Sequence, residues 1–213
     1  MTVQKAETKL TKAQRVIHHR FTHVRRVDKL VEAIDSLIPQ AATILDVGCG
    51  DGLLAYNLSR CSGGRELTGI EIQPRDGCLI PCTAFDGKTI PCAQGAFDYV
   101  MFVDVLHHTA NAEHLLREAV RVARHGIVIK DHYCESGFDF YTLSFMDWFS
   151  NSTKGVAIPR LYKAGAAWDA MFAGVGLRPV RTVVDLGLYP DPFNMIFGRK
   201  LHFVGLLEKT PSN

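Results

Sequence analysis

Three glycines at alternate positions, Gly48, Gly50 and Gly52, follow a short apolar run that contains the acid Asp46. Glycines between a strand and a helix let the backbone approach a ligand closely, and the helix N-terminus offers free N–H groups. The pattern therefore predicts a site for a nucleotide-like cofactor. A dinucleotide fingerprint would need its third glycine at position 53, where the chain has Leu53. The spacing thus disfavours an NAD-dependent dehydrogenase.

Two further acids follow at spacings that suit such a site. Glu71 ends the next apolar run, roughly 20 residues after the glycines, where a carboxylate can accept hydrogen bonds from both hydroxyls of a ribose. Asp86 and Gly87 follow the third run and would lie at the same edge of a parallel sheet. Asp-Gly is also an ordinary turn, so the order and spacing of these acids indicate more than either acid alone.

Polar side chains that could act on a substrate follow two later apolar runs. Asp104, His107 and His108 come after the fourth run, and Asp131 and His132 come after the fifth. Histidine titrates near neutral pH and therefore suits a general base. The two neighbouring histidines could instead only shape a turn between strand and helix, and that alternative stays open at this point.

The spacing of apolar residues predicts the strands and helices that position these residues. Strands are expected at 43–47, 66–71, 82–85, 97–103, 126–130, 179–184 and 201–207, and helices at 24–38, 53–60 and 113–123. Strands that alternate with helices predict an α/β fold with a parallel sheet covered on both faces. The last two strands are joined by a turn-rich loop without a helix, which suggests an antiparallel edge.

Length and composition fit one globular domain over residues 1–213, since the chain is 47% hydrophobic and 22% charged. No apolar run reaches the roughly 18 residues of a membrane helix, and the start has no signal-peptide pattern. We therefore expect a cytoplasmic protein with no membrane span. Its six cysteines include no C-x-x-C pair, so we expect reduced thiols and no zinc site.

The charge is uneven along the chain. Residues 1–30 hold eight basic and two acidic side chains, a net +6, which leaves −4 for the rest of a chain whose total is +2. This segment could bind an anionic partner or could simply be a solvated helix face. We interpret residues 1–40 as an N-terminal helical cover, in which Arg25 and Arg26 could reach the cofactor's carboxylate or cover its binding site.

The motifs together resemble one family, the class I S-adenosylmethionine-dependent methyltransferases. The resemblance runs over residues 24–130 and rests on segments 44–55 (ILDVGCGDGLLA), 69–72 (GIEI), 85–87 (FDG) and 97–108 (FDYVMFVDVLHH). Among subfamilies, the chain is similar to the small-molecule enzymes of the ubiquinone/menaquinone-biosynthesis type. The resemblance implies a Rossmann-like, doubly wound, mostly parallel sheet of seven strands with an antiparallel final strand and an N-terminal helical extension.

The resemblance also implies roles in binding S-adenosylmethionine. The glycine turn would lie against the methionine end of the cofactor, and Asp46 would hold its amino group. Glu71 would bind the ribose, Ile72 would pack on the adenine, and Asp86 would accept the adenine amino group. The complete set of expected cofactor contacts is Asp46, Gly48, Cys49, Gly50, Glu71, Ile72, Asp86, Gly87 and Val103.

Methyl transfer is an in-line displacement that depends chiefly on alignment, and it needs a base only if the acceptor must lose a proton. Carboxylate-accepting methyltransferases place a substrate-facing residue where His108 stands, so we predict His108, with Asp131 and His132, as the catalytic residues. Asp104 and Asp131 could hold Mg²⁺, as in catechol-type enzymes. The expected Asp-Asn pair is absent because His132 follows Asp131, so we predict no metal.

Residues 133–162 form a long, aromatic-rich connection that we interpret as a substrate-side insertion. The spacing of Tyr141, Phe145 and Trp148 also fits a core helix, and both interpretations can hold together. We therefore predict a methyltransferase for a small, apolar or aromatic acceptor. The alternatives are an RNA methyltransferase and a non-catalytic S-adenosylmethionine-binding partner protein. A nucleic-acid substrate is disfavoured because the basic N-terminus has almost no interleaved aromatic residues.

Overall fold

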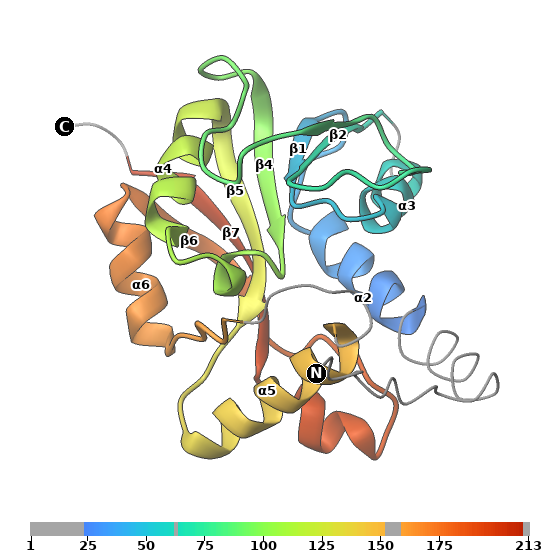
Figure 1. Ribbon diagram of the computed structural model, residues 1–213, viewed down its shortest axis with the longest axis vertical. Helices are drawn as coiled ribbons and strands as arrows, with labels where there is room; N and C mark the ends of the chain where they lie inside the picture. Colours follow the sequence, from blue (N-terminus) through green and yellow to red (C-terminus); the bar gives the residue numbers. More distant parts are fainter. Residues whose placement is uncertain (1–23, 62–63, 152–158, 211–213) are drawn as a thin grey trace, which may run out of the picture.

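The protein, seen in a computed structural model that describes residues 24–61, 64–151 and 159–210, is built around one seven-stranded sheet (Figure 1). The strand order is β3-β2-β1-β4-β5-β7-β6. The strands are β1 (Thr43–Val47), β2 (Glu66–Glu71), β3 (Cys82–Ala84), β4 (Phe97–Val103), β5 (Ala123–His132), β6 (Leu177–Val183) and β7 (His202–Lys209). The predicted α/β class and the seven strands are confirmed.

Strand directions match the predicted sheet with one refinement. Strands β1 to β5 pair in parallel, whereas β7 pairs antiparallel with both β5 and β6. The final strand is thus antiparallel, as expected. It lies inside the sheet, however, and β6 forms the edge, because the last connection doubles back between β5 and β6. That connection also contains a short π-helical turn, Asn194–Gly198, where the sequence predicted no helix.

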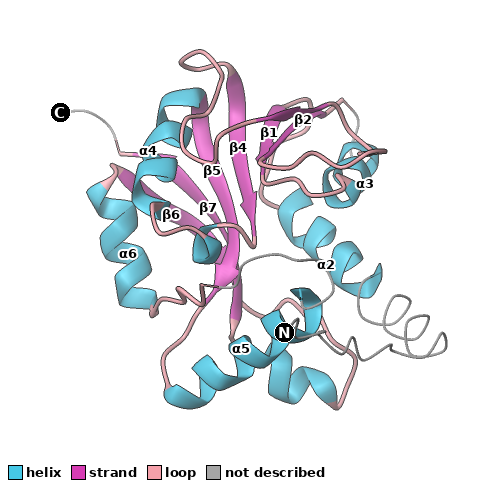
Figure 2. Cartoon of the chain, in the orientation of Figure 1, coloured by secondary structure: helices cyan, strands magenta, loops and turns pink. Residues whose placement is uncertain are grey.

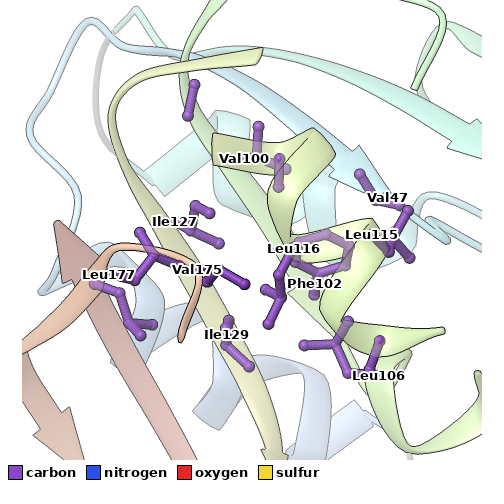
Figure 3. Close-up of a cluster of buried hydrophobic side chains, with 14 of the residues drawn as sticks. Val47, Val100, Phe102, Leu106, Leu115, Leu116, Ile127, Ile129, Val175 and Leu177 are labelled. Atoms are coloured by element: carbon purple, nitrogen blue, oxygen red, sulfur yellow. The ribbon is translucent and has the colours of Figure 1, made fainter. Parts of the chain in front are cut away.

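Helices cover both faces of the sheet, as Figure 2 shows. One core joins α4 (Ala112–Val122) and α6 (Gly165–Gly174) to the strands (Figure 3), and the other joins α2 (Val24–Asp35) and α3 (Leu53–Cys61). The β5 side chains alternate between the two, since Ile127 and Ile129 face the first core and Val128 the second. This alternation explains why β5 is apolar at consecutive positions.

The segment 133–162 differs most from the expectation. A helix, α5 (Gly137–Asn151), fills a stretch that we predicted to run about thirty residues before the next helix. The N-terminus of the helix is capped, because Ser136 Oγ accepts a hydrogen bond from Asp139 N and the Asp139 carboxylate accepts one from Glu135 N. The aromatic residues are not core, since Tyr141 is 74% and Trp148 54% exposed. Helix α5 lies beyond the carboxyl ends of β4 and β5 (Figure 1).

No helix among the described residues is long and apolar enough to cross a membrane. Helix α2 forms because its residues at helical spacing, Val27, Leu30, Val31 and Ile34, are all buried, and it ends at Asp35 rather than near Pro39. The basic residues that precede Val24 in the predicted N-terminal cover lie outside the described residues.

Candidate active site

The glycine turn after β1 needs its glycines for backbone geometry. Gly48, Gly50 and Gly52 have φ angles of 77°, 61° and 74°, in the left-handed region that favours glycine. A Cβ atom on Gly48 would lie 2.7 Å from Cγ2 of Val105. The turn after β1 therefore touches the turn after β4, which carries the candidate histidines. This contact brings the predicted cofactor side and the predicted acceptor side together.

Glu71 ties this turn to the end of β2. Its Oε2 accepts a hydrogen bond from Gly50 N at 3.0 Å, and its Oε1 accepts one from Ile72 N at 2.8 Å. Each carboxylate oxygen has a second lone-pair site, so the group can still accept hydrogen bonds from a ligand. The structure thus places the predicted ribose-binding carboxylate directly beside the glycine turn.

Asp46 lies in β1 and is only 4% exposed. Burial and then the nearby charge of Glu71 raise the pKa of the Asp46 carboxyl to about 7. Two carboxylates close together in a poorly solvated place favour a cationic ligand, which would relieve both effects. The amino group and the sulfonium of S-adenosylmethionine supply such charges.

The predicted adenine contacts lie at the ends of β2 and β3. Ile72 is 59% exposed, and a Cβ atom on Gly87 would lie 2.9 Å from its Cδ1. Asp86 Oδ1 accepts hydrogen bonds from Lys88 N and Thr89 N, both at 2.7 Å, and these lower the pKa of the Asp86 carboxyl. Asp86 therefore organises its own turn and has one carboxylate oxygen left for a ligand.

The two remaining predicted cofactor contacts lie in less polar surroundings. Cys49 Sγ is 3.4 Å from Cys82 Sγ, and burial, then the charge of Asp46, raises the pKa of the Cys49 thiol. Val103 is the last residue of β4 and pairs with Lys130 of β5. Neither residue offers a charged group to a ligand, so each can contribute packing.

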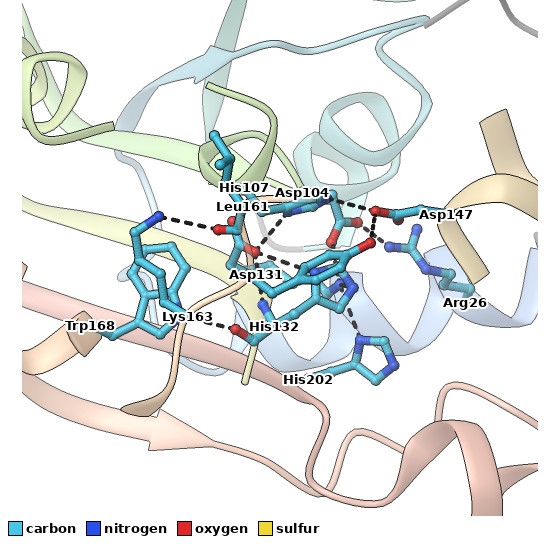
Figure 4. A network of polar contacts seen from close by, with 12 residues as sticks. Arg26, Asp104, His107, Asp131, His132, Asp147, Leu161, Lys163, Trp168 and His202 are labelled. Carbon is cyan, nitrogen blue, oxygen red and sulfur yellow. Dashed lines mark hydrogen bonds and ion pairs between the residues drawn. The ribbon is translucent and has the colours of Figure 1, made fainter. Parts of the chain in front are cut away.

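The acceptor side begins at Asp104, the residue after β4, which is a non-glycine residue at φ 57° (Figure 4). Its carboxylate forms ion pairs with Arg26 of α2 and with Lys130 of β5. These two cations outweigh the effect of burial and hold the pKa of Asp104 well below its usual value. Arg26 is thus engaged within the chain, and Arg25 donates to the carbonyl oxygen of Gly187.

Lys130 is fully buried, and burial lowers the pKa of its ammonium although Asp104 opposes the shift. Its Nζ lies 3.5 Å from His132 Nε2 and 3.3 Å from His202 Nδ1, so both nitrogens act as acceptors. Burial, then the charge of Lys130, lowers the pKa of His132 to about 4. His132 Nδ1 in turn lies 3.3 Å from Asp131 Oδ1. Both ring nitrogens of this predicted catalytic residue are therefore engaged.

His107, rather than His108, is the histidine bound to Asp131. His107 Nδ1 donates to Asp131 Oδ1 at 2.8 Å. Burial disfavours a charged ring, but the Asp131 carboxylate more than offsets this, so the pKa of His107 is raised. The Nε2 of His107 and the Nδ1 of His108 are buried without a hydrogen-bond partner among the described residues. The ring centroids of the two histidines lie 4.1 Å apart.

Two residues of the 133–162 segment complete this cluster, and the sequence predicted neither of them as a site residue. Asp147 of α5 is buried, and its Oδ2 lies 3.7 Å from His107 Nε2. Tyr162 donates a hydrogen bond to that same oxygen, and its ring centroid is 5.6 Å from that of His107. The sequence does contain a feature that could have indicated Asp147, because this acid stands between apolar and aromatic residues at 145–149.

Comparisons with known proteins match part of this chain to methyltransferases. Residues 45–129 match the family model of a methyltransferase domain. An uncharacterized methyltransferase of Mycobacterium sp. (strain JLS) is 32% identical over 107 residues, which are 47% of this chain and 42% of that protein. An ajmaline N-methyltransferase of Rauvolfia serpentina is 29% identical over 132 residues, 54% of this chain and 45% of that protein. The chain thus matches less than half the length of each of these curated relatives.

Solved structures share the fold at low sequence identity. A SAM dependent methyltransferase from Aquifex aeolicus superposes with a TM-score of 0.62 and 17% identity, covering 95% of this chain and 100% of that one. The family match spans the glycine turn, the acids Glu71 and Asp86, and most of the strands β1 to β4. Residues 45–129 therefore match the family model of a methyltransferase domain, and the chain has the fold of solved S-adenosylmethionine-dependent methyltransferases.

Proposed function

We propose that this chain transfers the methyl group of S-adenosylmethionine to a small, apolar or aromatic acceptor. The observation that carries the proposal is the contact between the turns after β1 and β4, where a Cβ atom on Gly48 would lie 2.7 Å from Val105. Through this contact, a cofactor on the glycine turn would lie next to the buried ring nitrogens of His107 and His108. Methyl transfer requires such proximity of donor and acceptor.

On the cofactor side, the proposal keeps every predicted contact. Asp46 would pair with the amino group, Glu71 with the ribose hydroxyls, and Asp86 with the adenine amino group. Ile72 would cover the adenine ring, since an exposed apolar side chain gains by burial against it. The remaining proposed contacts are Gly48, Cys49, Gly50, Gly87 and Val103.

On the acceptor side, the predicted catalytic residues differ in whether they have a polar atom without a hydrogen-bond partner. His108 has a free Nδ1 and can bind the acceptor or take its proton. Asp131 and His132 are positioning residues, because Asp131 holds His107 and His132 is held between Asp131 and Lys130. His107 joins His108 as a group with a free nitrogen.

The proposed acceptor class rests on the aromatic rings of residues 133–162. The ring centroid of Tyr162 lies 5.6 Å from His107, and that of Phe140 lies 5.9 Å from Tyr162. Flat apolar rings offer a large contact area with few rotatable bonds, which suits an aromatic or apolar acceptor. Phe140 and Tyr162, rather than the more exposed Tyr141, are therefore the proposed acceptor contacts.

Turnover of labelled S-adenosylmethionine with a panel of phenols, carboxylic acids and amines tests the proposal. We expect methylated product with at least one class and reduced turnover in Phe140→Ala, while the demethylated cofactor binds both proteins equally in calorimetry. Tight NAD binding would contradict the cofactor assignment. Cofactor binding without turnover of any acceptor would favour a partner protein, and salt-sensitive turnover of RNA alone would favour the RNA alternative.

A further inference from the structure

His107 and His108, in the turn after β4, lie close to the buried carboxylate of Asp147 in α5. Figure 4 shows His107 and Asp147 side by side. His107 Nε2 and His108 Nδ1 have no hydrogen-bond partner among the described residues, and the His107 side chain is only 1% exposed. One ligand atom from each of His107, His108 and Asp147 lies within 4.8 Å of the others. We propose that these three residues bind a divalent transition-metal ion of the zinc class, against the sequence expectation of no metal.

The distance between two of the proposed ligand atoms is close to that of a formed site. Zinc bonds of about 2.0–2.1 Å to nitrogen and oxygen put two ligands of a tetrahedron about 3.3–3.4 Å apart. His107 Nε2 and Asp147 Oδ2 are 3.7 Å apart, so this pair lies within a few tenths of an ångström of that separation, and the His108 ligand atom lies within 4.8 Å of both. Two imidazoles and one carboxylate are also the ligand set of catalytic zinc sites, which keep a fourth position open.

Hydrogen-bond partners of the proposed ligands also support a metal site. Metal-binding histidines almost always donate their other ring N–H to a carboxylate or carbonyl, which fixes the tautomer. His107 Nδ1 donates to Asp131 at 2.8 Å, and its Nε2 lies 3.7 Å from Asp147 Oδ2, where this nitrogen would give up its proton to bind the ion. Tyr162 donates to the Asp147 carboxylate and orients it. Each of these contacts would hold a ligand in place before an ion arrives.

A neighbouring group, Asp104, His107 and His132, also lies within ligand range but suits a cation poorly. The Asp104 carboxylate already pairs with the guanidinium of Arg26 and the ammonium of Lys130. Both ring nitrogens of His132 are engaged as well. An ion there would have to displace the guanidinium of Arg26 and the buried ammonium of Lys130, whereas the ring nitrogens near Asp147 have no hydrogen-bond partner among the described residues.

A third group consists of Cys49, Cys78 and Cys82 beside the glycine turn. Burial raises the pKa values of the Cys49 and Cys82 thiols, so both would have to lose tightly held protons to bind metal. This group is remote in sequence from the histidines and can be tested apart from them. Cys78→Ser therefore serves as a control for metal bound at the thiols.

Binding of the ion can be measured without methyl transfer, and only its consequence rests on the proposed function. The open fourth position would take one oxygen or nitrogen atom of the acceptor. The acceptor would then be an aromatic or apolar molecule that carries a hydroxyl, carboxylate or amine next to its methylated atom or at it. This narrows the acceptor class beyond its apolar character.

The test uses the full chain after treatment with a chelator. Zn²⁺ is titrated in competition with a chromophoric chelator, and Co²⁺ absorption in the visible range reports ligand geometry. We expect one ion per chain, and an affinity at least tenfold weaker in His108→Ala and in Asp147→Asn. Tyr162→Phe should weaken binding by about 10-fold or more, as loss of an outer contact does in other metal sites.

Matched controls lie on the surface. His114 of α4 and Asp169 of α6 are exposed, so His114→Ala and Asp169→Asn should bind the ion as the unmodified protein does. Circular dichroism and thermal unfolding establish that each variant is folded. Asp147→Asn keeps the size of the side chain and an oxygen that accepts the hydrogen bond from Tyr162. This variant therefore tests the metal site if His108→Ala does not fold.

Absence of Zn²⁺ and Co²⁺ binding in the unmodified chain would overturn the proposal, as would equal affinity in Asp147→Asn or loss of binding in Cys78→Ser alone. His107 would then be an imidazolium held between Asp131 and Asp147. Calorimetry with the demethylated cofactor on the same samples keeps the two proposals apart. Cofactor binding without metal binding would leave the methyltransferase proposal intact, and metal binding without cofactor binding would leave this one intact.

Discussion

Replacing Asp46 with asparagine separates the stability cost of this buried acid from its proposed use in binding the cofactor. The pKa of Asp46 rises from 3.8 to about 7 in the folded chain. At about 1.4 kcal/mol per pKa unit, the ionised form costs up to about 4 kcal/mol of folding free energy at high pH. An asparagine amide that stays partly unpaired costs about 1–3 kcal/mol. We therefore expect Asp46→Asn to stabilise the protein by about 1–3 kcal/mol at pH 8.

The sign of the pH dependence follows from the raised pKa. Between pH 3.8 and 7 the folded chain holds a proton on Asp46 that the unfolded chain has lost. Stability of the unmodified protein therefore falls as pH rises through this window, by up to about 1.4 kcal/mol per unit. Asp46→Asn lacks this dependence. The stability difference between the two proteins should grow from pH 5 to pH 7 and level off above it.

Urea denaturation at pH 5, 6, 7 and 8 measures this difference, and calorimetry with the demethylated cofactor measures binding. Asp46→Asn should lose about 1–3 kcal/mol of cofactor binding, because the amino group loses its carboxylate partner. A stability difference that does not change with pH would refute the argument from burial. Greater stability with unchanged cofactor affinity would refute the binding role of Asp46 alone.

Three further predictions use the same assays. Gly48→Ala should destabilise the chain by about 1–3 kcal/mol and weaken cofactor binding, because φ is 77° and the new Cβ atom would lie 2.7 Å from Val105. Gly50→Ala should cost less, because no atom lies within 4 Å of the Cβ atom that it would add. Glu71→Ala should weaken cofactor binding by about 1–3 kcal/mol, in calorimetry, since the ribose hydroxyls lose their acceptor. Asp98→Asn should cost about 1–2 kcal/mol at pH 7, because hydrogen bonds from the backbone N–H and then the hydroxyl of Thr43 lower the pKa of Asp98 to about 2. The stability that Asp98 contributes is present above pH 4 and is lost as pH falls through about 2.

Each of these predictions has an outcome that contradicts it. Equal losses in Gly48→Ala and Gly50→Ala would show that the contact with Val105 is not tight. Unchanged affinity in Glu71→Ala would remove the ribose assignment. An Asp98→Asn protein whose stability difference persists undiminished at pH 2 would show that the hydrogen bonds of Asp98 do not depend on its charge.

Sequence reasoning succeeded where the signal was local. The apolar runs around β1, β2 and β4 fall within a residue of the observed strands, because burial on both faces of a parallel sheet leaves a continuous apolar pattern. The glycine turn was predictable because Gly48, Gly50 and Gly52 adopt a backbone that other residues rarely adopt. These features depend on neighbours in the chain, so a single sequence contains them.

The acceptor side was predicted only in outline because its contacts join distant segments. Asp147 reaches His107 across 40 residues of sequence, and no periodicity marks that contact. The choice between His107 and His108 depends on the 3₁₀ turn Leu106–His108, which buries His107 and leaves His108 partly exposed. Lys130 ends the strand that the sequence predicts at 126–130, whereas β5 continues to His132. Its ion pair with Asp104 joins two separate strands, so the sequence alone could not distinguish Lys130 from an exposed residue at a strand end.

Several costs of folding coincide at one edge of the sheet, and that coincidence itself argues for function. Asp104 is a non-glycine residue in the left-handed region, Lys130 is fully buried, and Asp46 carries a raised pKa. Each feature costs free energy, and a chain selected for stability alone has simpler ways to fill the same space. All three lie at or near the carboxyl ends of β1, β4 and β5, where ligands bind in open α/β sheets. A ligand whose binding offsets these free-energy costs would place cationic groups against Asp46 and Glu71. It would also place a metal ion or a polar atom against the ring nitrogens of His107 and His108 that have no hydrogen-bond partner.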